Sequence, residues 1–165
     1  MSNSRSRWLI AAVALVWPLW CCADDVKPGS EELKRLDRYV GKWEGTVKET
    51  DLTSTSEMSW ILGGTVLQQK YKYSDGATGL ILRGYDKETG QYFFTLMDSR
   101  EIVLLLSNGS WDAATKTFKF DGYRGSENVT LRSTFPDNDT ENWAFTITKT
   151  GGEVTELRGT NKRSK

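Results

Sequence analysis

The chain has 165 residues, enough for one domain with a hydrophobic core, and its 22 basic side chains are balanced by 22 acidic ones. This balance argues against a nucleic-acid partner, because nucleic-acid-binding surfaces carry an excess of basic residues. The sequence has no histidine, which excludes Ser-His-Asp and Cys-His catalysis and argues against a zinc centre or a histidine-ligated haem, so no metal and no cofactor is expected.

Residues 1–23 have the pattern of a secretory signal peptide. Two arginines precede an uncharged apolar run that ends at Ala23 and is shorter than the roughly 20 residues a membrane-spanning helix needs. We expect cleavage after Ala23, which would leave a secreted or periplasmic chain with no transmembrane segment and no cysteine. The alternatives are an uncleaved anchor and a lipoprotein acylated at Cys21 or Cys22, although bulky residues precede both cysteines.

Residues 24–40 are predicted to form a polar lead-in followed by a short helix. Ser30 is a suitable N-cap, because its hydroxyl can accept a backbone hydrogen bond, and two glutamates follow it at the positive end of the helix dipole. Leu33 and Leu36 form an apolar stripe, and Gly41 ends the helix. A helix this short is marginal by itself, so we expect it to lie across one end of a larger structure.

Residues 41–161 are predicted to form one all-β domain. Short runs rich in β-branched and aromatic residues alternate with turns such as "LGGT" and "TGGE". The expected strands lie near 42–49, 56–62, 65–73, 78–85, 91–98, 101–107, 117–122, 127–135, 141–149 and 153–160. About ten consecutive strands joined by tight turns favour an antiparallel up-and-down barrel, which leaves no sheet edges, with the helix capping one end.

Alternation within the strands predicts which side chains point into the barrel. Along 65–73, for example, Gln69 shares a face with Leu67 and two tyrosines, whereas Lys70 and Lys72 lie on the other face. The inward residues expected to line a ligand pocket are Trp60, Gln69, Tyr71, Tyr73, Arg83, Tyr85, Phe94, Phe118, Trp143 and Phe145. An apolar wall with a few polar groups suits a small apolar ligand, but the same aromatics would also serve to fill a core. Both alternatives stay open here.

The stretch "GKW" (Gly41 to Trp43) resembles the Gly-x-Trp signature of calycin-type barrels, which include the lipocalins and fatty-acid-binding proteins. In such barrels a basic residue near the chain end packs across the tryptophan, and the resemblance implies Arg158 in that role.

Three longer stretches, "LDRYVGKWEG", "SWILGGTVLQQKY" and "GLILRGYDKETGQYFFTLMDS", resemble an exported bacterial family known only as domain of unknown function 1579. The matching positions are Trp43, Gly63, Gly64, Gly84, Tyr85, Asp86 and Asp98. The resemblance implies a calycin-like barrel and frequent export, and it implies no established activity.

Without histidine or a mature cysteine, catalysis would depend on carboxylates, tyrosines or arginines. Asp86 and Asp98 flank one predicted strand, where aspartates commonly accept backbone hydrogen bonds, so we interpret both as turn residues and assign no catalytic residue. The first hypothesis is an exported barrel that binds a small, largely apolar ligand. The others are an envelope protein-interaction module with a filled barrel and an enzyme acting on a hydrophobic substrate.

Overall fold

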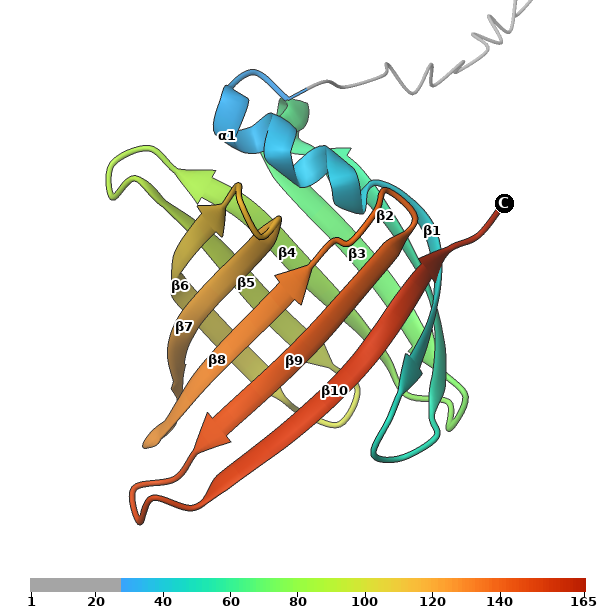
Figure 1. Cartoon of the computed structure of the whole chain (residues 1–165), viewed down its shortest axis with the longest axis vertical. Coiled ribbons are helices and arrows are strands. Elements are labelled where there is room, and N and C mark those ends of the chain that lie inside the picture. Colours follow the sequence, from blue (N-terminus) through green and yellow to red (C-terminus); the bar gives the residue numbers. More distant parts are fainter. Residues whose placement is uncertain (1–27) are drawn as a thin grey trace, which may run out of the picture.

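The computed structural model describes residues 28–165, and the expected signal peptide lies outside the described residues. Ten antiparallel strands form one closed barrel in which each strand pairs with its neighbours in the sequence and β1 also pairs with β10 (Figure 1). The strands are β1 (Gly41–Val47), β2 (Thr53–Ile61), β3 (Val66–Tyr73), β4 (Thr78–Asp86), β5 (Gln91–Asp98), β6 (Val103–Asp112), β7 (Thr117–Arg124), β8 (Glu127–Thr134), β9 (Thr140–Thr148) and β10 (Val154–Arg163). The predicted up-and-down barrel is confirmed.

Two strands continue further than the alternation predicted. β6 runs on through Trp111, and a register shift against β7 between Leu105 and Asn108 interrupts its inward–outward alternation. β10 continues to Arg163 through the polar sequence "GTNKR", which lacks the apolar residues that usually identify a strand. The extra residues of β10 are the ones that pair with the start of β1 and close the barrel.

A short helical segment covers one end of the barrel, as predicted (Figure 1). α1 (Glu31–Lys34) is capped by the Ser30 hydroxyl, which accepts a hydrogen bond from the backbone N–H of Leu33 (3.3 Å), and it continues as a 3-10 helix, η1 (Arg35–Tyr39). The chain leaves this segment through Gly41, whose φ of +121° is a conformation that glycine adopts readily. Within residues 28–165 no helix has the length and hydropathy needed to cross a membrane.

The half of the barrel next to this helical segment is filled by side chains. The Tyr39 ring packs on Phe135 (centroids 4.8 Å apart) and on Phe118 (5.7 Å), and Phe118 also contacts Tyr92 (5.1 Å). Trp43 is only 1% exposed and donates from Nε1 to the backbone oxygen of Tyr39 (2.7 Å). These side chains fill the barrel interior at what we call the closed end, and the interior spaces described below lie toward the opposite, open end.

The basic residue that packs on Trp43 is Arg163, and the expectation that Arg158 has this role is wrong. The guanidinium carbon of Arg163 lies 4.4 Å from the centroid of the Trp43 ring, and the same group donates to the backbone oxygen of Val40. Arg158 is exposed and pairs with Glu49 instead. The reason is strand geometry: Arg163 is the direct cross-strand partner of Trp43, and side chains alternate along β10, so Arg158 lies on the outer face and nearer the open end.

Candidate functional site

Two neighbouring spaces occupy the barrel interior between the filled half and the open end. The first is a cavity of about 70 Å³, which we call the inner chamber, and the second, of about 220 Å³, is the outer chamber. Five residues border both chambers, so the two spaces are adjacent: Tyr71, Tyr73, Leu96, Trp143 and Phe145. The outer chamber reaches the connections that follow β1 and β5, which lie opposite the helical segment (Figure 1).

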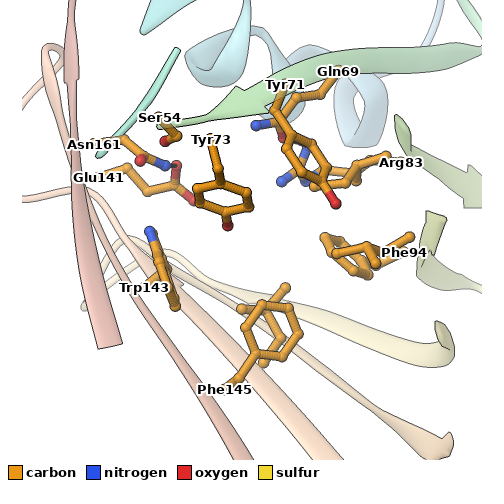
Figure 2. Close-up of a pocket in the computed structure, with 13 residues that line it drawn as sticks. Ser54, Gln69, Tyr71, Tyr73, Arg83, Phe94, Glu141, Trp143, Phe145 and Asn161 are labelled. Carbon is orange, nitrogen blue, oxygen red and sulfur yellow. Dashed lines mark hydrogen bonds between the residues drawn. The ribbon is translucent and has the colours of Figure 1, made fainter. Parts of the chain in front are cut away.

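Arg83 is the main polar group of the inner chamber. It comes from β4, is 4% exposed, and donates from Nη1 to Oε1 of Gln69 on the neighbouring strand β3 (2.7 Å). Its guanidinium carbon lies 4.4 Å from the ring centroid of Tyr39 and 5.1 Å from that of Phe94, so aromatic faces hold the cation in place. Figure 2 shows Arg83 and Gln69 reaching into the pocket on the same side.

Glu141 is the second buried charge on this wall, and it is held by its own hydrogen bonds. Its side chain accepts from the Ser133 hydroxyl (2.5 Å) and from Nδ2 of Asn161 (2.8 Å), and Ser133 in turn accepts from the Tyr39 hydroxyl (2.8 Å). Burial raises the pKa of Tyr39 and the negative charge of Glu141 raises it further, so this hydroxyl stays protonated. Both oxygens of Glu141 are therefore occupied by partners from β8 and β10.

The outer chamber has a largely apolar wall. Trp143, Phe145 and Ile147 line one side from alternate positions of β9, and the Trp143 and Phe145 rings meet edge to face with their centroids 6.0 Å apart. Arg100 stands at the rim, with its guanidinium carbon 5.3 Å from the Tyr73 ring centroid. The site therefore has buried polar groups at its inner end and an apolar wall further out, and the charged residues Asp98, Arg100 and Arg124 also line the outer chamber.

Two glycines determine the orientation of two aromatic rings in the wall of the site. Tyr71 is paired across the sheet with Gly79, and Trp143 is paired with Gly159. A Cβ built on either glycine would collide with the ring opposite, so each ring lies over a position that has no side chain. These rings consequently lie flat along the wall, which keeps part of the interior open.

The structure brings seven of the ten predicted pocket residues together around the inner chamber: Gln69, Tyr71, Tyr73, Arg83, Phe94, Trp143 and Phe145. The other three lie at or near the closed end. Trp60 donates from Nε1 to Oδ1 of Asp37 (2.7 Å), Phe118 is completely buried, and Tyr85 packs on the ring of Tyr92 (5.1 Å). Alternation assigns a side chain to a face of the sheet and gives no information on its depth in the barrel.

Sequence reasoning missed three polar residues of the inner chamber, Ser54, Glu141 and Asn161. Glu141 could have been found, because it shares its strand face with Trp143 and Phe145. Asn161 lies beyond the predicted end of the last strand, and Ser54 precedes the predicted start of the second. Nothing in the local sequence pattern identifies these two as inward-facing.

The aspartates that flank β5 are turn residues, as interpreted from the sequence. Asp86 accepts from the backbone N–H of Glu88 and from the Thr89 hydroxyl (both 2.9 Å), and these bonds lower its pKa. Asp98 accepts from the backbone N–H of Arg100 (2.8 Å). Within residues 28–165, no group of three or more cysteine, aspartate or glutamate side chains is placed to hold a metal ion. Three buried polar side chains, Gln69, Arg83 and Glu141, line the inner chamber, and Arg83 has a side-chain nitrogen without a hydrogen-bond partner.

Comparisons with known proteins support the fold. Residues 28–162 match the model of a family described as "Protein of unknown function (DUF1579)", and no curated protein matches the sequence. The S-type phycobiliprotein lyase CPES from Guillardia theta is similar in structure, with a TM-score of 0.58 and 12% identity over 84% of this chain and 99% of that one. EF1p2_mFAP2b, solved bound to DFHBI, aligns at a TM-score of 0.38 and 13% identity over 80% of this chain and 98% of its own. The likeness to the lyase shows a shared calycin-like barrel and extends to the fold alone.

Proposed function

This chain belongs to the DUF1579 family, whose description assigns no activity, and we propose from its interior that it binds a small, largely apolar ligand. The observation that carries the proposal is the adjacent pair of chambers, of about 70 and 220 Å³, which lie toward the end of the barrel opposite the helical segment. Together they approach the low end of the range for ligand pockets, roughly 300 Å³. A ligand of modest size would therefore fill the site.

The wall of the outer chamber supports an apolar ligand body. Trp143, Phe145 and Ile147 offer aromatic and aliphatic surface that is only partly buried by the protein itself. Covering this surface removes it from water, which favours binding by roughly 25 cal/mol per Å². The ligand enters at the open end and lies along β9, with its inner end toward Arg83.

A space-filling substitution tests whether the interior is the binding site. Leu96 lines both chambers, so Leu96→Trp should place an indole in the shared space and weaken binding of the neutral dye N-phenyl-1-naphthylamine at least about 10-fold. Met97→Trp is the matched control, because Met97 is the next residue of β5 and lies on the outer face. It should change the affinity by no more than about 2-fold. Dye fluorescence measures binding, and thermal unfolding checks both variants.

Two outcomes of this experiment would overturn the proposal. One is an absence of dye binding by the unsubstituted protein, and the other is equal binding by the Leu96→Trp and Met97→Trp variants. Either would direct attention to the outside of the barrel.

A protein-interaction module is the second candidate, favoured by an apolar patch on the outer surface. Val103, Leu105 and Tyr123 are each more than half exposed, and Leu105 pairs with Tyr123 while Val103 pairs with Met97. Binding of a partner through this patch would be insensitive to Leu96→Trp. The enzyme hypothesis has less support, because each oxygen of Glu141 already accepts a hydrogen bond and, among residues 28–165, no second carboxylate lines the inner chamber.

We further propose that the protein acts outside the cytoplasm. The support is the signal-peptide pattern of residues 1–23. N-terminal sequencing of the protein recovered from its native host should give Asp24 as the first residue. A protein that begins with the uncleaved apolar segment, or with an acylated cysteine, would contradict cleavage after Ala23.

A further inference from the structure

We propose that the ligand carries an acidic head group, of the carboxylate class, which binds Arg83 in the inner chamber while the apolar body occupies the outer chamber. This inference rests on the proposed function and adds the chemical class of the ligand.

The evidence begins with the unused binding capacity of Arg83. A guanidinium has five N–H donors, and the structure gives Arg83 one hydrogen-bonded acceptor, Oε1 of Gln69. Its Nε is the only fully buried side-chain nitrogen or oxygen without a hydrogen-bond partner among the described residues. No acidic side chain within residues 28–165 forms an ion pair with it at 4.0 Å or less. A buried cation with an orphaned donor is unusual, because both features disfavour folding unless something compensates them.

Within residues 28–165, no group of the protein other than Gln69 forms a hydrogen bond with the Arg83 side chain. Glu141 lines the same chamber, but its oxygens accept from Ser133 and Asn161. Burial raises the pKa of both Tyr39 and Tyr71, so neither hydroxyl supplies a negative charge. The donors of Arg83 that stay open to a group from outside the chain are those of Nη2, which has no hydrogen-bond partner among the described residues and, unlike Nε, keeps accessible surface.

A carboxylate fits this site in charge, geometry and size. Two parallel N–H groups of a guanidinium match the two oxygens of a carboxylate, and the rings of Tyr39 and Phe94 lie within cation–π distance of the Arg83 guanidinium and restrict its movement. Arg83 is 4% exposed, so little of its surface remains to be desolvated when a ligand binds. The chamber of about 70 Å³ is large enough for a head group and too small for the body of the ligand.

The first test compares two probes of the same shape on the unsubstituted protein. Octanoate and octanamide share chain length and planar head group and differ in charge, and each is titrated against bound N-phenyl-1-naphthylamine. Octanoate should displace the dye with an affinity at least about 10-fold higher than octanamide, as expected for charge-assisted hydrogen bonds to arginine. Equal affinities would overturn the acidic head group and leave the proposed function standing. If neither octanoate nor octanamide nor the dye binds, the proposed function fails, and this inference fails with it.

The second test assigns the effect to Arg83. Arg83→Gln should reduce octanoate affinity at least about 10-fold and leave octanamide within about 2-fold. Arg132→Gln makes the same change of side chain and charge on the exposed outer face of β8 and should leave both affinities unchanged. An equal loss for octanoate and octanamide in Arg83→Gln would mean that Arg83 only supports the shape of the cavity, which would overturn the assignment. If Arg83→Gln does not fold, the comparison of the two probes still decides the inference.

Discussion

Replacement of Trp43 by alanine is expected to lower the free energy of unfolding by about 3–5 kcal/mol, the range for truncation of a buried large aromatic residue. Trp43 is 1% exposed, its Nε1 donates to the backbone oxygen of Tyr39, and its ring lies beneath the guanidinium of Arg163. The substitution would leave a cavity where the helical segment, β1 and β10 meet. Urea unfolding followed by far-ultraviolet circular dichroism measures the change.

Two arginine variants provide the control for this prediction. Arg163→Ala removes the group that stacks on Trp43 and should lower the free energy of unfolding by about 2 kcal/mol, from its cation–π contact and its charge-assisted hydrogen bonds. Arg158→Ala removes an exposed ion pair and should change the free energy of unfolding by less than about 1 kcal/mol. If Trp43→Ala costs no more than Arg158→Ala, the description of the closed end is wrong.

Replacement of Glu141 by alanine should have the second-largest effect, a loss of about 2–4 kcal/mol in the free energy of unfolding. The reason is that Ser133 and Asn161 both donate to this carboxylate in a buried setting and would lose their acceptor. The loss of a buried negative charge also leaves Arg83 as the single charge on the wall of the inner chamber. Urea unfolding again gives the difference.

Glu141→Gln separates shape from charge in this network. Glutamine keeps the size of the side chain and one acceptor oxygen, so its loss of stability should be smaller than that of alanine. Glu156→Ala is the control for removal of an exposed carboxylate, because Glu156 lies on the surface and pairs with Arg158, and the substitution should change the free energy of unfolding by less than about 1 kcal/mol. Equal losses for Glu141→Ala and Glu156→Ala would show that the buried network contributes little.

The fold was predictable from the sequence because each strand carries its own signal. Alternation placed Leu67, Gln69 and Tyr71 on the inner face, and the structure has all three buried. It also placed Arg83 inside, where a charged residue would not be expected from hydropathy. Turn residues located the connections, and the number of strands then required closure, because an open sheet of ten strands would expose two long edges.

Two features were not predictable in this way: how deep in the barrel a side chain lies, and whether the interior is filled or holds a cavity. Trp60 and Phe118 alternate just as Tyr71 and Trp143 do, yet they lie at the closed end because the helical segment packs on that half of the barrel. Whether the rings fill the interior depends on how they lie against the opposite strand. That orientation follows from cross-strand pairs with glycine, which become known only with the register.

The pairing of β1 with β10 also constrains when this protein can fold. Trp43 and Arg163 are direct partners although nearly the whole domain separates them in sequence, so closure brings a large loss of chain entropy before the contact forms. Until β10 is in place, β1 keeps an unpaired edge, and so does the last strand that has joined the sheet. A chain that ends before β10 cannot close, and it would expose the edges of β1 and β9 to pairing with other chains.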